Sequence, residues 1–219
     1  YTKELKRLCK SKGIILIEDA CQAFMSKNNN VMIGSKGDIG CFSFGMTKLI
    51  SSGGGGIAVT NNKNLYERMQ LIRNHGVKDQ FTESWNCLGF NFKYSDILAS
   101  ITLIQLKRKN EIKNCILSIY KNYQKNLLKT NRVKLLETDI QAGNIPLYIE
   151  VVTDNRPNLV QFLKSKNIEV RVVPPNISES PYILKKNKYP NSIFFQDKVI
   201  YAPCGPDQST EDIKQVIEA

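Results

Sequence analysis

The sequence is poor in histidine and lacks regularly spaced cysteines, and this scarcity argues against several kinds of site. Its 219 residues include one histidine, His75, and six cysteines without a Cys-x-x-Cys pair. This composition argues against a zinc cluster and is typical of reduced thiols in a cytoplasmic protein. No run reaches the roughly 18 apolar residues of a membrane-spanning helix. The charged first residues do not resemble a signal peptide. We therefore expect a cytoplasmic protein with no membrane partner.

Acidic residues are scarce relative to basic ones. The chain has 20 Asp and Glu against 31 Lys and Arg, which gives a net charge of +11. Such a charge suits an acidic partner: a phosphorylated cofactor, a nucleotide sugar or a nucleic acid. Because lysine and asparagine are abundant along the whole chain, a solvated surface explains the charge more simply. Charge alone gives no reason to predict nucleic-acid binding, and we expect none.

The first part of the chain has the pattern of an α/β protein. Helices are predicted at residues 3–12 and 63–74, and strands at 14–17, 39–44 and 57–60. The continuous apolar run at 14–17 is typical of a strand buried on both faces of a parallel sheet. Three strands alone would form a narrow parallel sheet with open edges. We therefore expect more sheet to pair with them, from a partner chain or from an N-terminal region that this chain lacks.

The second part of the chain has a different pattern. Residues 95–129 contain neither Gly nor Pro and repeat apolar residues at helical spacing, which predicts one long helix or two joined end to end. After Thr130 the pattern is that of a small α+β domain. Its predicted strands are 133–136, 147–152, 169–173 and 199–202, and its predicted helices are 158–165 and 209–218.

A run of glycines follows Lys48. Gly53, Gly55 and Ala58 formally satisfy the dinucleotide fingerprint G-x-G-x-x-A. The run precedes a predicted strand, however, whereas that fingerprint opens a helix after a strand. No G-x-x-x-x-G-K-[ST] motif occurs, so a nucleotide-triphosphate loop is not supported. We expect these glycines to permit a tight turn with positive φ or a close approach of the backbone to a ligand.

Four residues near the predicted strand ends are candidates for chemistry: Asp19, Gln22, Ser43 and Lys48. Ligands gather at the carboxyl ends of strands in open α/β sheets. A lysine there can form a Schiff base, an acid can keep a pyridine nitrogen protonated, and a hydroxyl can bind a phosphate. Taken singly, each has a simpler explanation, since Asp19 could cap a helix, Ser43 could lie in a turn and Lys48 could be a surface lysine.

An ordered series of motifs surrounds these residues. The motifs are EDACQA at 18–23, GDIGCFSF at 37–44, Thr47-Lys48 before the glycines, LIRNHG at 71–76, LGFNFK at 88–93 and LASITLIQL at 98–106. In this order they resemble the DegT/DnrJ/EryC1/StrS family of sugar aminotransferases. The resemblance covers most of residues 13–110 and extends faintly into the C-terminal part. An ordered series of this kind is far more specific than any one motif.

The resemblance implies an α/β protein with the fold-type I architecture of pyridoxal-phosphate (PLP) aminotransferases. Residues 1–129 would form the C-terminal part of a PLP-binding large domain, with a mostly parallel sheet and a long connecting helix. Residues 130–219 would form a small C-terminal α+β domain. Members of the family usually work as homodimers with active sites at the subunit interface. We therefore expect a homodimer or pairing with a missing N-terminal segment.

The resemblance also implies roles for individual residues. Lys48 matches the lysine that forms the Schiff base with pyridoxal 5′-phosphate and then moves protons. Asp19 matches the acid on the pyridine nitrogen, and Gln22 matches a residue near the phenolic oxygen of the cofactor.

Three further residues have implied contacts with the cofactor. Ser43 matches a phosphate ligand, and Asn91 matches an asparagine that reaches the phosphate in the neighbouring subunit. Cys21 occupies the small position that packs on the ring face, where alanine is usual. A cysteine that only fills apolar space explains Cys21 equally well.

The implied reaction is a transamination in two halves. An amino donor, expected to be glutamate, converts the cofactor to its amine form, which then aminates the keto carbon of a nucleotide-linked sugar, expected to be an NDP-4-keto-6-deoxy sugar. Lys48 would act as acid and base in both halves. Related PLP enzymes that remove a sugar hydroxyl have histidine in place of the lysine, so Lys48 argues against that reaction.

Three departures from the family pattern support an alternative. The family's first segment is absent, Gly54 stands where glutamate is usual, and Lys93 stands where arginine is usual. Lysine keeps the charge of arginine but loses its planar fork of donors. The alternative is a truncated, non-catalytic family member that acts as a binding or partner subunit.

Overall fold

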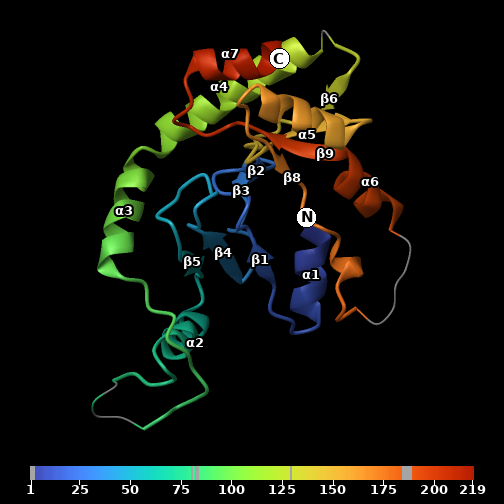
Figure 1. The fold of residues 1–219 in the computed structure, drawn as a ribbon. Helices are drawn as coiled ribbons and strands as arrows, with labels where there is room; N and C mark the ends of the chain where they lie inside the picture. Colours follow the sequence, from blue (N-terminus) through green and yellow to red (C-terminus); the bar gives the residue numbers. More distant parts are fainter. Residues whose placement is uncertain (1–2, 80, 82–83, 129, 184–188) are drawn as a thin grey trace. The chain divides into compact units, whose positions relative to one another are not determined.

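The computed structural model describes residues 3–79, 81, 84–128, 130–183 and 189–219. The chain divides into two compact units. The first unit contains Tyr1–Lys113 and Asp139–Leu147, and the second contains Asn114–Thr138 and Tyr148–Ala219. One long helix, α4 (Lys109–Leu127), contributes to both units (Figure 1). The predicted division into domains after residue 129 therefore stays a prediction.

The first unit is built on a three-stranded sheet in the order β1-β4-β5. Its strands are β1 (Ile17–Asp19), β4 (Ile39–Ser43) and β5 (Gly56–Val59). Strand β1 runs parallel to β4, but β5 runs antiparallel to it. The expectation of a mostly parallel sheet is therefore wrong for β5. The chain returns directly from β4 to its neighbour through a closed loop, and a direct return of this kind joins antiparallel strands.

The apolar run before β1 also differs from expectation. The strand begins at Ile17, so the strand predicted at residues 14–17 is placed too early. Ile14, Ile15 and Ile17 are each more than half exposed. The predicted burial on both faces is therefore wrong in this chain, where β1 is an edge strand of the sheet.

A short hairpin in the first unit was not predicted from the sequence. Strands β2 (Lys27–Asn28) and β3 (Val31–Met32) pair antiparallel. The turn between them is Asn29-Asn30, whose φ angles are +51° and +61°. Asparagine is among the residues that adopt this left-handed conformation in two-residue hairpin turns.

The helices of the first unit have clear start signals. They are α1 (Lys3–Ser11), α2 (Lys63–Arg73), α3 (Asp96–Lys107) and the beginning of α4. The Asn62 side chain accepts hydrogen bonds from the N–H groups of Asn64 and Leu65 at the start of α2, and Ser95 caps α3. Helices α3 and α4 meet at Arg108, so of the two predicted alternatives the structure has two helices joined end to end.

The core of the first unit lies beside β4. Phe44, Ile50 and Ile112 are buried together, and four half-buried side chains pack on them: Phe24, Leu49, Tyr94 and Leu106. Two of these residues, Leu49 and Ile50, come directly after Lys48. The segment that carries Lys48 is therefore anchored in the core on its C-terminal side.

The second unit is a small α+β structure with an antiparallel sheet in the order β6-β7-β9-β8. Its strands are β6 (Val133–Leu135), β7 (Ile149–Thr153), β8 (Arg171–Val172) and β9 (Val199–Ala202). Its helical segments after β7 are α5 (Arg156–Ser165), the short 3₁₀ turn η1 (Ile177–Glu179), α6 (Pro190–Lys198) and α7 (Thr210–Glu218). Helix α6 was not predicted.

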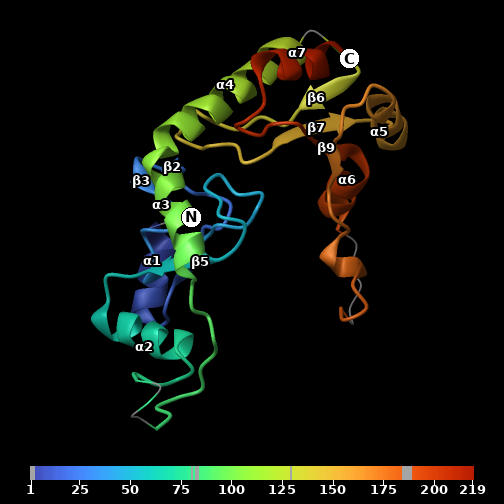
Figure 2. The ribbon, with the colours of Figure 1, turned by 60° about the vertical axis from the view of Figure 1, so that its left-hand side comes forward.

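One face of this sheet forms the core of the second unit. Ile149 and Val151 alternate inward on β7, and Ile200 on β9 is paired with Val151. Figures 1 and 2 both show α7 alongside the C-terminal half of α4. Among the described residues, no helix has the length and apolar character that crossing a membrane requires.

Candidate active site

Lys48 lies in a closed loop between β4 and β5. The Phe44 N–H donates to the Gly55 carbonyl and the Ser52 N–H donates to the Phe44 carbonyl, each at 3.0 Å. These two bonds close the loop at its base. Within it, the Lys48 N–H donates to the Gly45 carbonyl at 3.0 Å. The loop therefore presents Lys48 from a fixed base at the end of a strand.

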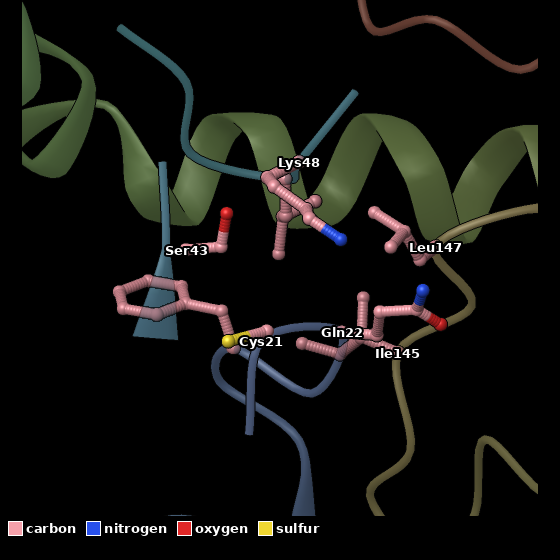
Figure 3. Close-up of a pocket in the computed structure, with 8 residues that line it drawn as sticks. Cys21, Gln22, Ser43, Lys48, Ile145 and Leu147 are labelled. Carbon is pink, nitrogen blue, oxygen red and sulfur yellow. The ribbon is translucent and has the colours of Figure 1, made fainter. Parts of the chain in front are cut away.

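The Lys48 side chain shares a small pocket with residues from three segments of the first unit (Figure 3). The pocket is lined by Cys21, Gln22, Phe24, Ser43, Lys48, Leu49, Ile145 and Leu147. Figure 3 shows the Lys48 amine pointing toward Leu147 and the Gln22 amide, with the Ser43 hydroxyl on the other side. The enclosed volume is about 10 Å³, which accommodates roughly one water molecule. These residues therefore form a wall of a site and do not enclose one.

Two hydrogen bonds hold the third segment of this wall. The Ile145 N–H donates to the buried Ser26 hydroxyl at 3.0 Å, and the Lys27 N–H donates to the Gly143 carbonyl at 2.9 Å. Ile145 and Leu147 were not among the predicted site residues. Nothing in their local sequence indicates a site, because they reach it through contacts with residues more than a hundred positions away.

Asp19 ends β1 next to this pocket. Its Oδ1 accepts a hydrogen bond from the Cys21 N–H at 3.1 Å, and its carboxylate also accepts from the Cys21 thiol. The thiol and then the N–H lower the pKa of Asp19, and the charge of Lys48 contributes in the same direction, while desolvation opposes them. The carboxylate therefore stays ionised. Residues 21–22 and 24–25 form turns and no helix begins after Asp19, so the alternative in which Asp19 caps a helix is wrong.

The pKa of the Cys21 thiol is shifted in the opposite direction, upward. The hydrogen bond to Asp19 comes first among the causes that raise the pKa of its thiol, with burial second, and together they bring it to about 11. The thiol lies on the pocket wall and also approaches the Cys41 carbonyl at 3.8 Å. Cys21 is therefore a neutral donor to the carboxylate and more than a filler of apolar space.

The structure brings together most, but not all, of the predicted site residues. Lys48, Gln22, Ser43 and Cys21 line one pocket, and Asp19 precedes two of them. The Ser43 hydroxyl accepts from the Gly45 N–H at 3.2 Å, and a hydroxyl that accepts one bond can still donate its own proton. Asn91 is exposed and pairs with Asn74 in an isolated bridge. It does not belong to the pocket lining found in the described part of the chain.

The donor set fits a phosphorylated pyridine aldehyde such as PLP. It supplies a primary amine for the aldehyde, an ionised carboxylate for a protonated ring nitrogen, and hydroxyl and amide groups for oxygen atoms. Because Asp19 is exposed and the enclosed volume is small, the ring would lie against the open side of this wall.

A larger cavity lies in the second unit and has a different character. Its volume is about 470 Å³, and it is lined mainly by apolar side chains of α4, α5, α7 and the sheet, such as Leu127, Phe162 and Val216. It contains none of the predicted site residues.

Comparison with known proteins identifies the family of the chain. The sequence profile of the DegT/DnrJ/EryC1/StrS aminotransferase family matches residues 2–219. The chain is 30% identical over 219 residues to the GDP-perosamine synthase of Escherichia coli O157:H7, an alignment that covers 99% of this chain and 60% of that protein. It is 29% identical over 227 residues to the UDP-4-amino-4,6-dideoxy-N-acetyl-beta-L-altrosamine transaminase of Campylobacter jejuni subsp. jejuni serotype O:23/36, covering 97% and 59%.

Solved structures show the same fold. The Helicobacter pylori aminotransferase PseC, involved in the biosynthesis of pseudoaminic acid, superposes with a TM-score of 0.86 at 20% identity, over 99% of this chain and 61% of that chain. The aminotransferase TlmJ from Streptoalloteichus hindustanus superposes with a TM-score of 0.87 at 21% identity, over 97% and 59%. The chain thus spans about three fifths of the length of these relatives. With its sequence matched from residue 2 to its end, the chain belongs to the DegT/DnrJ/EryC1/StrS aminotransferase family.

Proposed function

We propose that this chain provides the lysine-bearing wall of a PLP-dependent aminotransferase that acts on a nucleotide-linked keto sugar. The observation that carries the proposal is the position of the Lys48 amine, which shares one pocket with Ser43, Gln22 and Cys21 beside an ionised Asp19. Two similar proteins are named for GDP-linked and UDP-linked amino sugars. Their names support an NDP-4-keto-6-deoxy sugar as the substrate. Glutamate as the amino donor rests on the family resemblance of the sequence.

PLP, when bound, supplies an electron-withdrawing ring that makes the Cα–H bond of an attached amine acidic. Lys48 would hold the cofactor covalently through its ε-amine while the site waits for substrate. Once displaced by an amine substrate, the free amine of Lys48 would take the proton from Cα and return it at C4′. The closed loop that carries Lys48 would keep this amine within reach of both atoms.

The other residues of the wall would hold and polarise the cofactor. Asp19 would keep the ring nitrogen protonated, because its carboxylate is already held ionised by Cys21. Ser43 would donate its proton to the phosphate, and the Gln22 amide would lie near the phenolic oxygen. Cys21 would back the ring face while it donates to Asp19.

The open side of the wall leads us to propose a homodimer, or pairing with a further segment, that completes the site. Asn91 lies outside the Lys48 pocket of its own unit and is exposed. This placement supports a role in the site of the neighbouring subunit. Helix α3 also exposes large apolar side chains, with Ile97 76% exposed and Leu103 60% exposed, and such a surface suits a protein partner.

The test is a titration of the purified protein with PLP, followed by borohydride reduction and peptide mapping. We expect a visible absorbance band that borohydride converts into a stable adduct on Lys48. The Lys48→Ala variant should lack both the band and the adduct. Lys63→Ala is the matched control, because the Lys63 side chain is 86% exposed on α2, and it should behave like the unmodified protein.

Two results would contradict the proposal in different ways. An adduct spread over several surface lysines would remove Lys48 from its role. No band at all in the unmodified protein would mean that this chain does not complete a cofactor site, which favours the alternative of a non-catalytic partner subunit.

A further inference from the structure

Three hydroxyl groups meet next to the Lys48 loop. The Tyr94 hydroxyl lies 2.6 Å from Thr102 Oγ1 and also hydrogen-bonds the Ser52 hydroxyl. Ser52 and Thr102 are buried, at 7% and 5% exposed. We call Ser52, Tyr94 and Thr102 the hydroxyl clamp. It joins the base of the Lys48 loop to helix α3.

The ring of Tyr94 fixes the other side of the same loop. Gly55 has a φ of +79°, and a Cβ there would come within 2.2 Å of the Tyr94 ring. The ring also lies 6.4 Å from the ring of Phe44, centroid to centroid. Phe44, Ser52 and Gly55 are the residues whose backbone bonds close the loop. Tyr94 therefore touches every part of the base from which Lys48 projects.

We propose that Tyr94 is a positioning residue that holds the Lys48 loop in place through the hydroxyl clamp. The inference rests on the proposed function, which gives the reason why Lys48 must be held in place. The clamp itself consists of contacts within the first unit. Burial strengthens these hydrogen bonds, because water does not compete for the same donors and acceptors in the interior.

Both neighbours of the Tyr94 hydroxyl have a second hydrogen-bond partner. The Ser52 hydroxyl also donates to the Gly54 carbonyl and the Thr102 hydroxyl to the Leu98 carbonyl, each at 3.0 Å. Three hydroxyl protons cannot fill all four short contacts at once, and without the Tyr94 hydroxyl Ser52 and Thr102 can each still donate to their own carbonyl. The Tyr94→Phe variant keeps the ring against Gly55 and loses the hydroxyl contacts with Ser52 and Thr102.

The first measurement is amide hydrogen exchange of Tyr94→Phe without cofactor. We expect the amides of Lys48 and Ser52 to exchange roughly tenfold faster, the effect of one lost buried hydrogen bond. The amides of Lys36 and Gly37, which donate to Glu18 elsewhere in the unit, should be unchanged. Tyr66→Phe is the matched control, since Tyr66 is exposed on α2 and its hydroxyl bonds Gln70.

The second measurement is PLP titration of the same variants below their melting temperatures. We expect Tyr94→Phe to bind PLP roughly tenfold more weakly at Lys48, and Thr102→Val to act in the same direction. The double variant should bind PLP only slightly more weakly than either single variant, because both substitutions remove the same contact between Tyr94 and Thr102. Tyr66→Phe should bind PLP normally.

The outcomes separate this inference from the proposed function. Unchanged exchange of the Lys48 and Ser52 amides in Tyr94→Phe would overturn the clamp, as would faster exchange with unaltered PLP affinity. If the Tyr94→Phe amides exchange faster but the unmodified protein binds no PLP, the clamp is supported and the proposed function is overturned.

Discussion

At the end of β1, two neighbouring carboxylates have opposite surroundings. Glu18 is 7% exposed and accepts hydrogen bonds from the N–H groups of Gly34, Lys36 and Gly37. It therefore fixes the loop that leads into β4. Asp19, the next residue along the strand, is exposed. The sequence identifies both as acids at a strand end, but the alternation of side chains along a strand gives them different roles.

The raised pKa of Cys21 predicts a slow reaction with alkylating reagents. A shift from 9.0 to about 11 leaves roughly a hundredfold less thiolate at neutral pH than an ordinary cysteine has. We expect iodoacetamide to modify Cys21 slowly in the native protein, with the rate rising up to about pH 11. Asp19→Asn should accelerate the reaction, because the bond to Asp19 is the largest cause of the shift. Mass spectrometry of the Cys21 peptide over time measures the rate.

The control for this prediction is the urea-unfolded protein, in which Cys21 should react at an ordinary rate. The raised pKa of Cys21 also makes the stability of the fold depend on pH. Between about pH 9 and 11 the unfolded chain releases the Cys21 proton and the native chain retains it, so this group's contribution to stability falls as pH rises. Fast native alkylation of Cys21 at pH 8, equal to that in urea, would contradict the hydrogen bond to Asp19.

At the scale of the loop, the glycine run predicts a graded series of substitutions. Gly54→Ala should change the free energy of unfolding by less than about 0.5 kcal/mol, because space there is open and φ is not positive. Gly53→Ala should cost about 1–2 kcal/mol, since φ is +89° in open space. Gly55→Ala should cost about 2–4 kcal/mol, because a Cβ would also meet the Tyr94 ring. Urea unfolding measures all three.

Comparing Gly53→Ala with Gly55→Ala separates the cost of backbone strain from the cost of contact with the Tyr94 ring. Gly53 and Gly55 share a positive φ, so any excess cost at Gly55 comes from Tyr94. Equal costs at Gly53 and Gly55 would mean that the ring moves aside freely. That result would also weaken the case for Tyr94 as a support of the Lys48 loop.

Secondary structure was largely predictable where local pattern decides it. The α3–α4 pair follows from apolar residues at helical spacing and from the absence of Gly and Pro in residues 95–129, and β4 and α2 lie within one residue of their predicted bounds. The direction of β5 did not follow, because a strand's pattern is the same whether it runs parallel or antiparallel to its neighbour. Helix α6 was missed because its residues expose apolar side chains such as Phe194 and lack a helical stripe.

At the scale of the whole molecule, the site is only partly encoded in continuous sequence. The motifs around Asp19, Ser43 and Lys48 predict side chains that the structure places in one pocket or, for Asp19, two residues before one of its lining residues. The third segment was not predictable, since Ile145 joins the wall through Ser26, 119 positions away. Asn91, in contrast, is predicted as a site residue from the family pattern but lies outside the pocket of its own unit. A completed site that uses two chains would explain this position.

A mixing experiment tests this shared site. In a homodimer whose sites each take Lys48 from one subunit and Asn91 from the other, Lys48→Ala and Asn91→Ala variants would each be defective in both sites. Random exchange of subunits would place one intact site in half of the dimers, which restores about a quarter of the tight, borohydride-trapped PLP sites. The measurement is the trapped PLP per chain after mixing, beside sedimentation of each variant. No recovery among dimers that do exchange would remove Asn91 from the neighbouring site, and a monomer in sedimentation would overturn the homodimer itself.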